Sequence, residues 1–280
     1  MIRRPPRSTL SSSSAASDVY KRQAHAWVKA DSDVAAAHLD NDPSTDPFAL
    51  LAGKTSCHTG WLKSAGMLLP MGYLIGNGYA NVVGDANDIS SLSATIYEFF
   101  NDDASIPESG TPYYGYSGAV KCLSEGAGDV AFAKDSTIES YCNNEDATEN
   151  EDWCLAMDQY VALPAFGQAP SHPVMYNPNL LDVQTRTAIL NALMSLNNEM
   201  YVVDYPMMGT TYTGCYDFVT HQVDSTSDMN TCGDQILENV LNTPGIERVN
   251  SQTHLGSYSS IIKHVPGIST YYDTKYEITD

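Results

Sequence analysis

A tight turn between a short strand and an apolar helix constrains the fold more than any other stretch of the chain. Residues 54–57 have the pattern of a strand, residues 59–66 are rich in small side chains, and an apolar run follows over residues 67–75. The order strand, tight turn, helix is typical of α/β folds, in which ligands bind beyond the carboxyl ends of the strands. We therefore expect an α/β protein with a ligand near this turn.

The turn carries the residue types that bind a small anion. Thr59 supplies a hydroxyl, Lys63 supplies a positive charge, and Ala65 and Gly66 are small enough for an anion to reach the main chain. Free N–H groups at the start of a helix attract negative charge. An ordinary junction between a loop and a helix has the same composition, so both interpretations stay open at this point.

The acidity of the chain bears on its partners. The 280 residues carry a formal net charge of −20, which argues against a nucleic-acid partner, because phosphates are neutralised by clustered Lys and Arg. The hydrophobic share of 42% is enough for one large or two modest domains. The longest apolar run, residues 67–75, is interrupted by Pro70 and Gly72 and is much shorter than the roughly 18–20 residues of a membrane-spanning helix.

The first 23 residues differ in composition from the rest. They hold five of the 14 basic residues but only one of the 34 acidic residues. A transit peptide has such an Arg- and Ser-rich, acid-poor composition. We favour a translated sequencing-adapter or vector scar, and we expect a non-native, disordered leader. The natural chain would then begin inside a domain near Ala24, with its own N-terminus and signal peptide missing.

The cysteines leave two interpretations open. None of them forms a C-x-x-C pair, so zinc ribbons and thioredoxin-like redox chemistry are unsupported. An even number at wide spacings fits disulfides formed in an oxidising compartment, and scattered free thiols of a cytosolic protein are the alternative. The six are Cys57, Cys122, Cys142, Cys154, Cys215 and Cys232.

Two further segments carry candidate metal ligands. Three tyrosines and two glycines occur within residues 113–119, and Tyr116 is the last of the three tyrosines. A trivalent cation such as Fe³⁺ makes phenol deprotonation favourable, and hard cations prefer oxygen ligands. His172 lies between Pro170 and Pro173, so it belongs to an extended segment that can present its imidazole to a ligand. Aromatic packing for Tyr116 and an ordinary surface position for His172 are the alternatives.

Periodicity predicts the remaining elements in outline. We expect a loop over residues 31–47 and an amphipathic helix over residues 182–197. The residues expected on or near its apolar face are Val183, Ile189, Leu190, Leu193, Met194 and Leu196. We expect strands over residues 24–30, 129–133 and 159–164, and helices over residues 89–100, 236–241 and 258–264.

Three segments together resemble the transferrin family. They are GKTSCHTGWLKSAGMLLPMGYLI (residues 53–75), YYGYSGAVKCLSEGAGDVAFAKDSTI (residues 113–138) and APSHPV (residues 169–174), in the order and near the spacing of the family. The resemblance covers residues 24–175 well and residues 176–280 loosely. The later segments THLGSY and VPGISTYY look most like algal phytotransferrins.

The resemblance implies a fold and a domain organisation. We expect a periplasmic-binding-protein-like transferrin lobe with two subdomains around a cleft that closes by a hinge motion, truncated at its N-terminus. Residues 24–169 would form the anion- and iron-binding subdomain. Residues 170–280 would form the returning part of a second, incomplete subdomain.

The resemblance also implies a ligand set for Fe³⁺ and carbonate. In transferrins the metal is held by an Asp, two Tyr, a His and a bidentate carbonate. Tyr116 matches the second tyrosine and His172 matches the histidine. The residues that match the carbonate-binding positions are Thr59, Lys63, Ala65 and Gly66.

This chain departs from the family at two places. Lys63 stands where most lobes have Arg; it keeps the charge but loses the planar fork, so we expect a weaker or more acid-labile carbonate. The first tyrosine ligand would fall at Arg22, and the aspartate would lie further upstream. Tyr20 is no substitute, because two residues along a strand displace the side chain by roughly 7 Å. Two of the four protein ligands therefore remain.

The family resemblance supplies disulfide pairings as well. Cys57–Cys122 matches the family bridge that ties the anion-binding helix to the tyrosine segment. We assign the other four cysteines by expectation to Cys142–Cys154 and Cys215–Cys232.

The expected function is binding of ferric iron with synergistic carbonate for uptake or transport, with release on acidification. We expect an extracellular or cell-surface location with cycling through endosomes, and a membrane receptor or an anchor beyond this fragment. An enzyme is not expected, because the chain has no G-x-S-x-G elbow, H-E-x-x-H or P-loop. The alternative is a solute-binding or interaction module of the same fold that binds another anion or metal or has lost iron.

Overall fold

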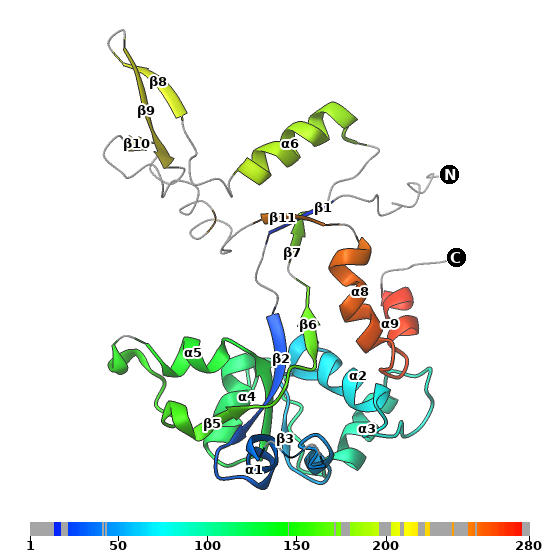
Figure 1. Ribbon diagram of the computed structural model, residues 1–280. Coiled ribbons are helices and arrows are strands. Elements are labelled where there is room, and N and C mark those ends of the chain that lie inside the picture. Colours follow the sequence, from blue (N-terminus) through cyan, green and yellow to red (C-terminus); the bar gives the residue numbers. More distant parts are fainter. Residues whose placement is uncertain are drawn as a thin grey trace, which may run out of the picture. The chain divides into compact units, whose positions relative to one another are not determined.

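The computed structural model describes two compact units (Figure 1). One combines Arg22–Ala169 with Ser257–Asp280, and the other combines Met1–Lys21 with Pro170–Gly256. The described residues are 14–17, 22–40, 42, 44–144, 146–170, 172–174, 180–195, 203–207, 210–217, 222–224, 237, 246–249 and 251–275.

A mixed sheet forms the centre of the larger unit. Its strand order is β3-β4-β2-β5, and β6 also pairs with β2. β3 runs parallel to β4, with Cys57 beside Ala131, whereas β2 runs antiparallel to β4, β5 and β6. The bounds are β2 (Arg22–Lys29), β3 (Ser56–Cys57), β4 (Val130–Lys134), β5 (Tyr160–Ala162) and β6 (Gly167–Ala169).

The alternation of burial along β2 explains why this segment is a strand. Ala24, Ala26 and Val28 are buried, whereas the residues between them are half-buried. Because successive side chains of a strand point to opposite faces, this pattern puts one face of β2 against the main core. The strand that the sequence predicts over residues 24–30 is therefore confirmed, with its start at Arg22.

Helices surround this sheet. In the larger unit they are α1 (Asp33–Leu39), η1 (Ala49–Leu51), η2 (Ser64–Leu68), α2 (Leu69–Gly76), α3 (Ser91–Phe99), α4 (Gly115–Ser124), α5 (Thr137–Cys142), η3 (Ala147–Glu149), η4 (Met157–Gln159) and α9 (Ile268–Lys275). α8 (Ser251–Ile262) begins in the smaller unit and ends in the larger one.

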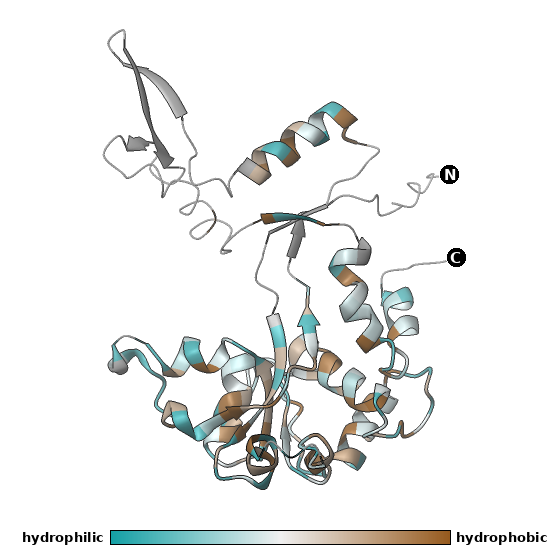
Figure 2. Ribbon diagram, in the orientation of Figure 1, coloured by the Kyte–Doolittle hydropathy of each residue, from teal (hydrophilic) through white to brown (hydrophobic). Residues whose placement is uncertain are grey.

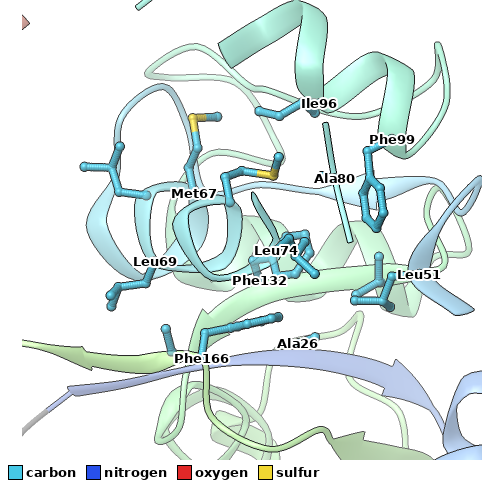
Figure 3. Packing of buried hydrophobic residues seen from close by; sticks show 14 of the residues in the cluster. Ala26, Leu51, Met67, Leu69, Leu74, Ala80, Ile96, Phe99, Phe132 and Phe166 are labelled. Atoms are coloured by element: carbon cyan, nitrogen blue, oxygen red, sulfur yellow. The ribbon is translucent and has the colours of Figure 1, made fainter. Parts of the chain in front are cut away.

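The core of the larger unit forms where η2 and α2 pack on the sheet (Figure 3). Met67, Leu69 and Leu74 are completely buried there beside Phe132 of β4 and Phe166. The rings of Phe132 and Phe166 lie 5.7 Å apart at a tilt, a favourable arrangement for two aromatic rings. The apolar run that follows the turn is thus buried in the core, and this packing holds the turn against the sheet.

The smaller unit is described in parts. β1 pairs with β7 and with β11, and β9 pairs with β8 and with β10, all antiparallel. The bounds are β1 (Ser14–Ser17), β7 (His172–Val174), α6 (Val183–Ser195), β8 (Val203–Met207), β9 (Thr210–Asp217), β10 (Gln222–Asp224) and β11 (Ile246–Val249). Among the described residues, no helix is both long and apolar enough to cross a membrane.

The structure differs from the sequence-based expectations in the N-terminal part. Residues 31–47, expected as a loop, contain α1, because Ser32 caps a run of residues that includes buried Val34 and Ala35. Residues 1–23 were expected to be disordered, but Ser14–Ser17 form β1 and pair through the main chain with β7 and β11. Strand pairing satisfies main-chain groups whatever the side chains are, so composition alone does not reveal it.

Two differences concern the second half. Residues Ser257–Asp280 group with the larger unit, although we expected all of residues 170–280 in the second subdomain, because Ile262, Val265 and Ile268 join the main core. The helix expected over residues 182–197 exists as α6, and Figure 2 shows hydrophilic and hydrophobic residues mixed along it. Val183 and Ile189 are 67% and 44% exposed, so they do not belong to its packed face. The helix expected over residues 236–241 lies largely outside the described residues.

Candidate functional site: an anion cradle beside two tyrosines

The turn after β3 has an unusual main-chain course. Gly60 has a φ of 130°, and Leu62 has a φ of 56°. A left-handed conformation is common for glycine but costs energy for leucine, and such strain is concentrated at functional sites. Lys63 then returns to an extended conformation, and η2 begins at Ser64.

The start of η2 presents main-chain donors that the described residues do not use. The N–H groups of Met67 and Leu68 both donate to the Lys63 carbonyl, at 2.9 Å and 3.0 Å, which makes this turn a local π-helix. No acceptor for the N–H groups of Ser64, Ala65 and Gly66 is found in the part of the chain that the structure describes, and no side chain caps the helix. Three donors therefore remain for a ligand.

The Thr59 hydroxyl faces the same place. Thr59 is only 2% exposed, and its Oγ1 has no hydrogen-bond partner among the described residues. A Cβ built on Gly66 would overlap Oγ1 and approach Thr59 Cβ to 2.6 Å. A buried hydroxyl without a partner is costly, so a hydroxyl held beside three free N–H groups fits an anion that accepts from all of them. We call Thr59, Ser64, Ala65 and Gly66 the anion cradle.

His58 supports the cradle from behind. Its ring is completely buried, with Nδ1 2.8 Å from the Gly66 carbonyl oxygen and Nε2 3.1 Å from Ser56 Oγ. The ring also stacks on Phe132, with 5.0 Å between the ring centres. Burial lowers the pKa of His58 to about 4, although the hydrogen bond to Gly66 acts in the opposite direction. His58 is therefore neutral at physiological pH and donates from Nδ1 to Gly66.

Lys63 points its charge at a tyrosine. Its Nζ lies 5.2 Å from the centre of the Tyr114 ring. A hydrogen bond with Lys63 and the positive charge of that ammonium hold the pKa of the Tyr114 phenol below its usual value, Ser109 acts in the same direction, and burial opposes them. The cation of the turn is thus in contact with Tyr114, the residue that precedes α4.

Tyr116 lies in the first turn of α4, which is tied to the cradle. The Gly115 N–H donates to the Thr59 carbonyl at 2.9 Å, and the disulfide Cys57–Cys122 joins β3 to the same helix with 6.1 Å between the Cα atoms. The Lys134 Nζ lies 5.7 Å from the centre of the Tyr116 ring. The larger unit therefore holds one candidate metal ligand and the complete cradle together.

A second tyrosine joins this group from a distant part of the chain. Tyr258, in α8, has its hydroxyl 3.0 Å from Ser64 Oγ at the start of the cradle helix. Burial raises the pKa of Tyr258, and the nearby Tyr116 acts in the same direction, while hydrogen bonds with Ser64 and Tyr272 act against them. Sequence reasoning missed Tyr258, His58 and Tyr114, because none of the patterns that we used brings distant side chains together.

The structure also places the remaining candidates. His172 lies in β7 of the smaller unit, where its main chain pairs with Ser17, and its side chain lies outside the described residues. The expected pairing Cys142–Cys154 is present, with 5.5 Å between the Cα atoms, whereas Cys215–Cys232 lies outside the described residues. Among the residues described, no three His, Cys, Asp or Glu side chains gather to hold a metal ion.

Comparison with known proteins gives a consistent family. The transferrin family model matches residues 100–172, a range that contains Tyr116 and His172. Serotransferrin from Bos taurus is 36% identical over 151 residues, which cover 45% of this chain and 21% of that protein. Lactotransferrin from Homo sapiens is 36% identical over 111 residues, which cover 36% and 15%. In both comparisons, part of this chain is similar to transferrins.

The extent of the transferrin match is limited. This chain spans about a fifth of the length of the curated transferrins that it matches. Among solved structures, transferrin 1 from Manduca sexta is similar with a TM-score of 0.43 and 17% identity, over 58% of this chain and 30% of that protein. The matched family segment does not reach the cradle at residues 59–66, so the cradle stands on its own geometry.

Proposed function

We propose that this chain is part of a transferrin-family protein that binds ferric iron together with a carbonate ion. The observation that carries the proposal is the cradle. Within the described part of the chain, the buried Thr59 hydroxyl has no partner, and the N–H groups of Ser64, Ala65 and Gly66 beside it have no acceptor. Carbonate is small, flat and doubly charged, so its oxygens can accept from several of these donors at once.

The residues around the cradle suit a metal ion bound next to the anion. Tyr116 is the proposed phenolate ligand, and it lies in the first turn of α4, whose first residue, Gly115, donates its N–H to the Thr59 carbonyl. A hard trivalent cation favours oxygen ligands and stabilises the phenolate. His172 is the proposed imidazole ligand, on the resemblance of its own segment.

We further propose that acid releases the iron. Protons compete with the metal for carbonate, for the Tyr116 phenolate and for His172, and histidine is the ligand most readily charged in a mildly acidic compartment. A protein that loads iron at neutral pH and unloads it in acid is suited to extracellular transport and uptake, either through a membrane receptor or as part of a larger anchored protein. Lys63 in place of Arg makes the carbonate easier to lose, because the bidentate fork is missing.

The test uses the chain with bicarbonate and then with ferric nitrilotriacetate. Bicarbonate alone should shift the backbone amide resonances of Ser64, Ala65 and Gly66. Ferric ion added with bicarbonate should give a visible phenolate-to-iron absorption band that the Tyr116→Phe variant lacks. Tyr113→Phe is the matched control, because the Tyr113 hydroxyl donates to Glu125 at 3.0 Å instead. A band that persists in Tyr116→Phe, or one that needs no bicarbonate, would overturn the proposal.

A second candidate is an anion-binding module that carries no iron. It is favoured by one observation: the cradle is complete within the larger unit, whereas the described residues of that unit supply one proposed metal ligand. Bicarbonate-dependent amide shifts without any visible band on adding ferric ion would favour this second function.

A further inference from the structure

Lys63, the positive charge next to the cradle, contacts Tyr114. Neither the comparisons nor the family resemblance supplies a role for Tyr114. Lys63 immediately precedes the three free N–H groups, yet its ammonium lies on the ring of Tyr114, 5.2 Å from the ring centre. Lys63 is exposed to solvent and is carried on a flexible four-carbon stem, so it can move.

Tyr114, in contrast, is held in place. A Cβ built on Gly60 would come within 2.7 Å of Tyr114 Cε2, so the ring lies directly over that glycine. The Tyr114 N–H donates to the Thr111 carbonyl at 3.1 Å, and the next N–H, of Gly115, donates to the Thr59 carbonyl. The phenol ring is therefore a fixed part of the turn, and Lys63 is the mobile member of the pair.

An anion in the cradle and the Tyr114 ring attract the same ammonium. The anion would lie at the N–H groups of the residues that directly follow Lys63, so a swing of one side chain is enough to exchange the partners. The contact with Tyr114 therefore lowers the affinity of the cradle for the anion, because Lys63 must leave the phenol before it can bind the anion.

We propose that Tyr114 is a positioning residue that competes with the bound anion for Lys63 and thereby sets how tightly the cradle holds carbonate. This inference rests on the proposed function of the cradle. Tyr114 lowers the affinity for the anion. When the anion leaves, Lys63 returns to Tyr114, so the free energy needed to release the anion is smaller than it would be if Lys63 had no other partner.

The experiment compares Tyr114→Leu with the natural chain and with Tyr113→Phe. The amide resonances of Ser64, Ala65 and Gly66 are followed in iron-free protein during titration with sodium bicarbonate at constant ionic strength. Tyr114→Leu removes the aromatic ring that the Lys63 ammonium contacts, so we expect it to bind bicarbonate about two- to fivefold more tightly, the range for one exposed cation–π contact. Tyr113→Phe should bind like the natural chain.

A second measurement follows Lys63 itself. The Lys63 side-chain resonances carry a ring-current shift from Tyr114 in the natural chain without bicarbonate, and this shift should disappear in step with the amide changes during the titration. If Tyr114 had a purely structural role, bicarbonate would leave the ring-current shift of Lys63 unaltered. This measurement needs no variant, so it decides the matter even if Tyr114→Leu folds poorly.

The outcomes separate the two proposals. If bicarbonate shifts no cradle amide in the natural chain, the anion-binding function fails, and this inference fails with it. If bicarbonate binds but Tyr114→Leu has the natural affinity or a lower one, or if the Lys63 shift persists at saturation, competition by Tyr114 is wrong while the cradle stands.

Discussion

Two helices in the larger unit differ in whether their first main-chain N–H groups have a capping partner. At α1, Ser32 has an extended conformation, and its Oγ accepts from the Ala35 N–H at 3.1 Å, while Asp33 supplies a negative charge in the first turn. At η2, no side chain caps the helix and no acidic residue lies in its first turn. The chain completes the first helix start by itself and leaves the second one open.

The difference shows where a ligand is expected. Unused N–H groups, a buried Thr59 hydroxyl without a partner and a left-handed Leu62 each cost stability, and they occur together only a few residues apart. A capping Ser or Asp, as at α1, would remove part of this cost but would occupy the donors or repel an anion. The concentration of these costs at one helix start supports the proposal that it binds an anion.

The largest expected effect comes from filling the space of the cradle. Gly66→Ala places a methyl group on Thr59 in a fully buried position, so we expect a loss of about 3 kcal/mol in the free energy of unfolding and no bicarbonate binding. Chemical denaturation and the amide titration measure the two effects. Gly256→Ala in α8 is the control, since no atom lies within 4 Å of its Cβ, and alanine in a helix should be neutral or stabilising. Normal bicarbonate binding by Gly66→Ala would contradict the cradle geometry.

Acid should lower the free energy of unfolding through His58, the buried histidine that supports the cradle. The unfolded chain takes up a proton at this histidine below pH 6.5, whereas the folded chain does so only near a pKa of about 4. Stability from the buried neutral ring is thus complete above pH 6.5 and falls as the pH drops toward 4, by roughly 3 kcal/mol in all. Denaturation curves at several pH values should show this slope in the natural chain and in His38→Gln, a control in the last turn of α1. The slope should be reduced in His58→Gln; an unchanged slope there would mean that another group causes it.

A smaller effect is expected at the capped helix start. Ser32→Ala removes the acceptor for the Ala35 N–H, so the free energy of unfolding should fall by about 1 kcal/mol. Bicarbonate binding should not change, because the cap of α1 serves only the helix. A measurable change in the amide titration of the cradle would show that the two helix starts are coupled.

The smallest effect on stability should come from Thr59→Val. Valine has nearly the same shape and removes a buried hydroxyl that has no partner among the described residues, so the iron-free chain should change by less than about 1 kcal/mol, toward higher stability. Bicarbonate binding should nevertheless weaken by about tenfold, the effect of losing one hydrogen bond to a charged ligand. Destabilisation with normal binding would mean that the hydroxyl serves the fold.

Much of the local structure can be predicted from the sequence. The alternation along β2, the strand, turn and helix order around residues 54–75, and the helix that appears as α3 all follow from period and composition. α1 was missed although Ser32 and three successive alanines were visible, because the acidic, proline-containing surroundings suggested a loop. For short helices, such local signals compete with the flanking residues.

The sequence alone places Thr59, Ala65 and Gly66 of the cradle, together with Lys63, within eight residues of one another. Tertiary structure decided what those residues do. It buried His58 against Phe132, left Thr59 Oγ1 without a partner, set Lys63 on Tyr114, and brought Tyr258 to Ser64 from 194 residues away. The physical reason is that periodicity encodes which face of an element is buried, whereas the partner that meets each face depends on how all the elements pack together.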